Sequence, residues 1–128
     1  MKTIFLAIAL AVAFSLSGIA AETPGKTSVL RHVVAFKFKP GTDAAEIKKI
    51  ENAFRDLKKK IPQIAAYEWG TNNSPEKHDK GFTHCFILTF KSEKDRDAYL
   101  PHPDHKAFGK ILGPVLEDVF VVDYWAKD

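Results

Sequence analysis

The amino-acid sequence predicts an α+β domain with the ferredoxin-like order β-α-β-β-α-β. Four segments, at residues 30–39, 64–71, 82–91 and 118–125, are rich in β-branched and aromatic residues, a composition that favours strands. Between them, apolar residues recur at spacings of three and four, which is the spacing of one helix face. Two right-handed crossovers would place both helical regions on one face of a four-stranded antiparallel sheet.

The first half of the domain begins after a short linker. Residues 22–29 are polar and contain proline and glycine, and the strand at 30–39 ends at Pro40. Asp43 and Glu46 resemble a capping box, which predicts the start of a helix. One face of that helix carries apolar residues at spacings of 3, 4, 3 and 4, and a proline ends it: Ile47, Ile50, Phe54, Leu57 and Ile61.

The second half continues with two strands joined by a polar loop at 72–81. Ser92 and its neighbours predict a short helix, which the double-proline segment 101–103 interrupts because proline lacks a backbone donor. Asp104 is then the expected cap of a second helical piece, and the Gly-Pro pair at 113–114 ends it. The strand at 118–125 completes the predicted sheet.

Composition excludes several classes of protein. The chain has 128 residues, of which 45% are hydrophobic and 27% charged, so it can form one small domain but not two. A single cysteine, Cys85, excludes an intramolecular disulfide and a multi-cysteine zinc site. The net charge of +3 is small, and neither a glycine-rich phosphate loop nor a serine nucleophile motif occurs. We expect no cofactor, no metal and no nucleic-acid partner.

Residues 1–21 have the layout of a secretory signal peptide. Lys2 precedes an unbroken apolar run at 4–14, and small residues follow this run. The run is shorter than the roughly 20 residues that a membrane span needs. We therefore expect cleavage after Ala20 or Ala21, a secreted or periplasmic protein, and no membrane attachment after cleavage. An uncleaved anchor is the alternative.

Alternation along the strands assigns the side chains to the two faces of the sheet. The bulkier sets are expected to face the helices, and each of three such sets contains one polar residue: His32, His84 or Asp123. Burying such a group without a partner costs roughly 1–3 kcal/mol. These groups should therefore pair with each other, with water or with a ligand, and Asp123 is the expected partner of one histidine.

The opposite face of the sheet has no helix left to cover it. Its expected members are mostly apolar: Val33, Ala35, Cys85, Ile87, Thr89, Phe120, Val122 and Tyr124. An apolar sheet face in water is an association site, and a second copy of the same sheet would cover it with two-fold symmetry. We therefore predict a homodimer. The alternative is that Lys37, Glu68 and the linker make this face polar enough for a monomer.

The most distinctive segment joins the two pieces of the second helical region. Tyr99 ends the first piece and His105 begins the next, so the stiff elbow could direct both side chains into the space between helices and sheet. Histidine can act as a general base, and a tyrosine hydroxyl can stabilise a developing oxyanion. The alternative is structural: Tyr99 packs and His105 caps the helix. A metal site at His102 and His105 is disfavoured because Pro103 lies between them.

Five segments of the sequence resemble the stress-responsive dimeric α/β-barrel (Dabb) family over residues 30–126. They are LRHVVAFKFK at 30–39, YEWG at 67–70, GFTH at 81–84, YLPHPDH at 99–105 and VDY at 122–124. The resemblance implies a ferredoxin-like protomer and a homodimer whose two sheets close into a dimeric α/β barrel. Most members have no assigned activity.

One plant member of the family cyclises a polyketide by aldol chemistry. By resemblance to it, Tyr99 and His105 are the candidate catalytic residues, and His32 lies in the same pocket. We expect an exported, stress-related homodimer with a small apolar pocket, lined by His32, His84, Asp123, Phe54, Phe86 and Trp69. The alternatives are a cyclase or lyase that acts on a small carbonyl compound through Tyr99 and His105, and a purely structural dimer.

Overall fold

The computed structural model describes residues 28–128, and it has the predicted order of elements. The predicted signal peptide at 1–21 lies outside the described residues. The elements are β1 (Leu30–Phe38), α1 (Ala44–Lys60), β2 (Ala66–Thr71), β3 (His84–Phe90), α2 (Glu93–Tyr99), α3 (Pro103–Leu112), the 3-10 turn η1 (Gly113–Val115) and β4 (Leu116–Trp125). The second helical region is therefore two helices, as its proline elbow predicts.

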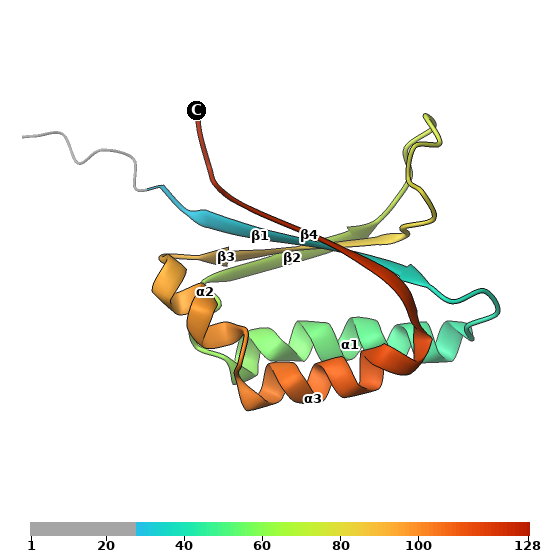
Figure 1. The fold of residues 1–128 in the computed structure, drawn as a ribbon, viewed down its shortest axis with the longest axis horizontal. Coiled ribbons are helices and arrows are strands. Elements are labelled where there is room, and N and C mark those ends of the chain that lie inside the picture. The colour runs from blue at the N-terminus through green and yellow to red at the C-terminus, as the bar shows by residue number, and fades with distance from the viewer. Residues whose placement is uncertain (1–27) are drawn as a thin grey trace, which may run out of the picture.

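The four strands form one antiparallel sheet in the order β2-β3-β1-β4. The helices lie together on one side of it, so the domain has two layers (Figure 1). This arrangement is the ferredoxin-like fold. Within residues 28–128, no helix has the length and apolar character that crossing a membrane requires.

The hydrophobic core lies between the sheet and the helices, on the face that alternation assigns to it. Strand register places directly paired residues on one face, and His32 of β1 is opposite Leu88 of β3 and Asp123 of β4. The buried core combines side chains of the two central strands with those of the helices: Leu30, Val34, Phe36, Phe86, Leu88, Phe90, Ile50, Phe54, Leu57, Tyr99, Phe108 and Leu112, among others. The helix-facing side chains of β1 and β3 are buried because these two strands are at the centre of the sheet.

Several predicted boundaries are wrong by about two residues. β2 begins at Ala66 rather than at position 64, because Ile64 closes a turn onto the carbonyl of Ile61. β3 begins at His84 rather than at position 82, because the Phe82 amide donates to Asp79 in another turn. β4 begins two residues early, directly after the 3-10 turn.

Two of the three predicted helix caps also differ from the expectation. Asp43 is at the N-cap of α1, but its side chain makes no capping hydrogen bond, so the capping box is not formed. α3 is capped by His102 instead of Asp104, because Pro103 suits the first helical position and the Asp104 amide then donates to His102 Nδ1 at 3.1 Å. The Ser92 cap of α2 is present, with the Asp95 amide 3.1 Å from Ser92 Oγ.

The outer face of the sheet, meaning the side away from the helices, is apolar and open. Three large side chains of β4 on this face are between 42% and 53% exposed: Phe120, Val122 and Tyr124. None of the helices between residues 28 and 128 covers them, and the β2–β3 loop and the C-terminal residues both extend on this side of the sheet (Figure 1). Thr89 is the buried exception, and it accepts a hydrogen bond from Arg31.

Candidate functional site

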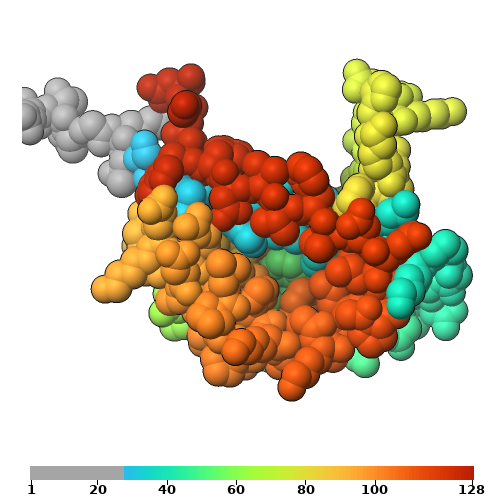
Figure 2. Space-filling model, in the orientation of Figure 1, coloured from blue at the N-terminus to red at the C-terminus, as the bar shows by residue number. Residues whose placement is uncertain are grey.

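A groove runs between β4 and the helices α2 and α3 (Figure 2). Val119 and Val121 belong to the helix-facing side of β4, yet they are 44% and 50% exposed, so the helices do not reach this edge strand. The space-filling view shows the hollow between β4, in red, and the orange helices, with blue and green atoms of earlier elements on its floor (Figure 2). Asp123 continues the same row of side chains. We call this hollow the β4 groove.

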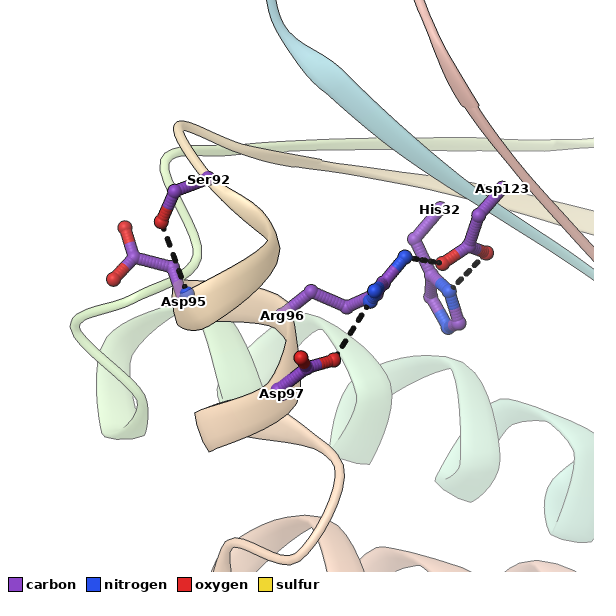
Figure 3. Close-up of polar contacts among 6 residues, drawn as sticks. All are labelled: His32, Ser92, Asp95, Arg96, Asp97 and Asp123. Carbon is purple, nitrogen blue, oxygen red and sulfur yellow. Dashed lines mark hydrogen bonds and ion pairs between the residues drawn. The ribbon is translucent and has the colours of Figure 1, made fainter.

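The buried His32 and the partly exposed Asp123 form a pair at this edge of the sheet. They are register partners on adjacent strands, and His32 Nδ1 lies 2.7 Å from Asp123 Oδ1 (Figure 3). A carboxylate only accepts hydrogen bonds, so His32 donates from Nδ1, and in the neutral ring Nε2 then carries the lone pair. The other carboxylate oxygen of Asp123 accepts a hydrogen bond from Arg96 Nη1 at 3.2 Å. The predicted histidine–Asp123 pairing is therefore present.

Tyr99 is in ring contact with both His32 and His105. It is the last residue of α2 and is only 1% exposed. Its ring centroid is 5.9 Å from that of His32 and 4.3 Å from that of His105. Burial raises the pKa of the Tyr99 phenol far above its usual value of 10, so the hydroxyl keeps its proton and remains a donor.

His105 is held by the elbow that precedes it. It is the third residue of α3, and its Nδ1 lies 2.8 Å from the Leu100 carbonyl oxygen. A carbonyl oxygen can only accept, so Nδ1 donates and Nε2 keeps the lone pair. In its neutral form the half-buried His105 therefore has its lone pair on Nε2, as His32 does. The predicted proximity of Tyr99, His105, His32 and Asp123 is what the structure has.

His84 and Trp69 are not part of this group. His84 is the register partner of Phe36 on β1. Phe36 is four residues from His32, and four residues span roughly 13 Å along a strand. Its Nε2 lies 3.1 Å from Glu51 Oε1, its Nδ1 lies 2.8 Å from Thr83 Oγ1, and Trp69 stacks on its ring. The expectation of one cavity shared by all three polar groups is therefore wrong, because aromatic core residues fill the space between them.

Phe54 and Phe86 belong to that filling and do not line an open pocket. They are 2% and 0% exposed, and their rings stack in parallel with centroids 4.2 Å apart. Tyr67 stacks on both of them, with its ring centroid 5.7 Å from that of Phe54 and 6.4 Å from that of Phe86. The Tyr67 hydroxyl is buried and has no hydrogen-bond partner among the described residues, and its burial raises the pKa of the phenol to about 12. The predicted pocket between helices and sheet is thus closed here.

Two partners in these networks were not predicted from the sequence. Arg96 reaches Asp123 from α2, and Glu51 reaches His84 from α1. Spacing offers a signal for both, because Arg96 is three residues before Tyr99 and Glu51 is three residues before Phe54, which puts each on the edge of a buried helix face. In residues 28–128 there is no cluster of three or more histidine, cysteine, aspartate or glutamate side chains that could hold a metal ion.

A pocket of about 460 Å³ lies on the outer face, on the opposite side of the sheet from Tyr99 and His105. Its walls come from the ends of β2 and β3 and from the loop between them, and they include Ala35, Trp69, Phe82, Cys85 and Ile87. Partial burial raises the pKa of the Cys85 thiol, which keeps the sulfur protonated and less nucleophilic. Sequence analysis predicted the apolar character of this face but not its hollow.

Sequence comparison identifies the family. The family model described as "Stress responsive A/B Barrel Domain" matches residues 30–126. The stress-response A/B barrel domain-containing protein HS1 of Arabidopsis thaliana is 33% identical over 95 residues, which are 74% of this chain and 87% of that protein. Olivetolic acid cyclase of Cannabis sativa is 26% identical over 95 residues, which are 74% of this chain and 94% of that protein.

Solved structures with the same fold include an enzyme and a dimer. The hydroxynitrile lyase of Passiflora edulis is 27% identical, with a TM-score of 0.74 over 80% of this chain and 97% of that one. A dimeric protein of unknown function and ferredoxin-like fold from Bacteroides fragilis is 29% identical, with a TM-score of 0.63 over 77% of this chain and 96% of that one. With its fold and with the family match over residues 30–126, the chain belongs to the stress-responsive A/B barrel domain family.

Proposed function

We propose that this protein binds a small apolar carbonyl compound in the β4 groove and transfers protons to and from it. One observation carries the proposal: the Tyr99 ring contacts two histidine rings whose Nδ1 atoms are both engaged, His32 with Asp123 and His105 with Leu100. In the neutral form of each ring Nε2 then carries the lone pair, and both rings contact a tyrosine whose phenol remains protonated. A base next to a neutral oxygen donor is the combination that enolate chemistry requires.

The proposed step is proton abstraction from the carbon next to the carbonyl group. His105 Nε2 takes the proton, the electrons of the C–H bond form the C=C bond of an enolate, and the carbonyl oxygen becomes negative. The Tyr99 hydroxyl donates a hydrogen bond to that oxygen as its charge develops. Return of the proton from His105 restores the starting compound, and attack of the enolate on a second carbonyl group would give an aldol product.

The names of two similar proteins support a reaction of this kind. One similar protein is named a cyclase and another a hydroxynitrile lyase, and their matches cover 74% and 80% of this chain. The exposed valines of β4 give the groove an apolar wall, and Asp123 adds a polar group to the same row of side chains. Such a groove suits a compound with one polar and one apolar end.

Titration of the isotope-labelled protein with phenylacetone, a small apolar ketone, tests the binding site. We expect amide chemical-shift changes at the α2–α3 elbow and along β4, because these elements border the groove. The Lys58–Lys60 end of α1 should not respond, since it is exposed and outside the groove. Changes confined to the 460 Å³ outer-face pocket, or no saturable change, would contradict the proposed site.

We also propose that the protein is a homodimer joined through the outer faces of two sheets. The exposed apolar side chains of β4 need a cover, and none of the described helices supplies it. The Bacteroides fragilis protein of the same fold, 29% identical, is described as dimeric. A second sheet of identical chemistry would cover the face with two-fold symmetry.

Export is the third part of the proposal, and it rests on the apolar run and small residues of the leader. Intact-mass measurement of the protein made with its own leader should show a chain that begins at Ala21 or Glu22. The fraction outside the inner membrane should contain it. A full-length chain embedded in the membrane would contradict cleavage and favour the anchor.

A further inference from the structure

Arg96 connects the short helix α2 to the edge strand β4. Its Nη1 donates to Asp123 Oδ2 at 3.2 Å, and its Nε donates to Asp97 Oδ1 at 3.1 Å (Figure 3). The side chains of Arg96 and Asp123 are 21% and 22% exposed, so water screens this ion pair less than it would a surface pair. The contact spans 27 residues of sequence and crosses from the helix layer to the sheet.

Helix α2 needs such a connection because it has few others. It is seven residues long, too short to be stable in isolation, and Tyr99 is its single buried residue. Arg96 and Tyr99 are three positions apart and therefore share a face of the helix. Arg96 engages the carboxylate that holds His32, and Tyr99 contacts the His32 ring itself.

We propose that Arg96 is a positioning residue of the site, which fixes the Asp123 carboxylate toward His32 and the Tyr99 ring against it. Asp123 has two oxygens, and Arg96 occupies one of them while the other accepts from His32 Nδ1. Without the guanidinium, the partly exposed carboxylate is free to rotate into water. His32 then loses its fixed acceptor, and either ring nitrogen can carry the proton.

The positioning role rests on the proposed function only for its effect on proton exchange. Its effect on the geometry of His32 and Tyr99 is tested separately. Long-range ¹⁵N–¹H NMR of labelled protein reports which nitrogen of His32 is protonated. We expect the Nδ1–H form alone in the wild type. Arg96→Gln should give a mixture of both forms and should weaken the nuclear Overhauser contacts between the His32 and Tyr99 rings. Arg96→Lys keeps the charge without the planar fork and should restore most of the Nδ1–H form.

Asp97→Asn is the matched control, because Asp97 is the other partner of Arg96 and its side chain is 62% exposed. It should leave the His32 spectrum unchanged. An unchanged His32 spectrum in Arg96→Gln overturns the positioning role, and Arg96→Met, which also removes the guanidinium, is read the same way and decides if the glutamine variant does not fold. If the tautomer is lost but the wild type does not exchange the α protons of phenylacetone, the positioning role stands and the proposed chemistry falls. If the tautomer is lost in Arg96→Gln and the wild type does exchange these protons, Arg96→Gln should slow the exchange about tenfold with little change in KM.

Discussion

Ile87→Glu should separate the dimer into monomers or prevent folding. Ile87 lies on the outer face near its centre, where its register partners are Val33 of β1 and Glu68 of β2. A glutamate there would be enclosed by the second sheet without a partner, and it would stand directly opposite the carboxylate of Glu68. Enclosing an unpaired charge costs several kcal/mol, and about 4 kcal/mol corresponds to a thousandfold loss of affinity.

Sedimentation velocity measures this change as a halved mass of the folded protein. Ile111→Glu is the matched control, since Ile111 is 37% exposed on α3, in the helix layer on the opposite side of the molecule. It should keep both the dimer mass and the thermal stability. A folded Ile87→Glu protein with the wild-type mass would show that the interface is elsewhere.

The order of elements and the faces of the sheet follow from local patterns, which is why the sequence suffices to predict them. Alternation with a period of two separates His32 from Val33 wherever the strand lies in the fold. The spacing of three and four that begins at Ile47 likewise defines the buried side of α1 before its neighbours are known. Boundaries depend on turns such as the one at Ile64, which are weaker signals.

The candidate site is predictable where a single elbow or the alternation along paired strands determines it. The elbow sets the distance between Tyr99 and His105 by itself, and neighbouring strands in register bring Asp123 to His32. Arg96 and Glu51 reach their partners across layers, which depends on how helix and sheet pack. The filling of the space between His32 and His84 by Phe54 and Phe86 depends on helix–sheet packing in the same way.

Tyr99→Phe and His105→Ala should each slow the exchange of the α protons of phenylacetone about 10²- to 10³-fold, the usual contribution of a general base or an oxyanion donor. The loss of the ketone's α-proton signal in D₂O measures the rate. His78→Ala, in the exposed β2–β3 loop, and Tyr124→Phe, on the outer face, are matched controls and should exchange at the wild-type rate.

Stability separates catalysis from a purely structural role of the same residues. Phenylalanine preserves the ring contacts of Tyr99 with His32 and Phe90, and the Leu100 carbonyl left by His105→Ala can bond to water at the half-buried elbow. Each catalytic variant should therefore lose less than about 1.5 kcal/mol of unfolding free energy. A structural network would instead lose roughly 1–3 kcal/mol for each group left unpaired, with unchanged exchange. Variants that unfold more easily but exchange normally would thus assign Tyr99 and His105 to the fold and remove them from the chemistry.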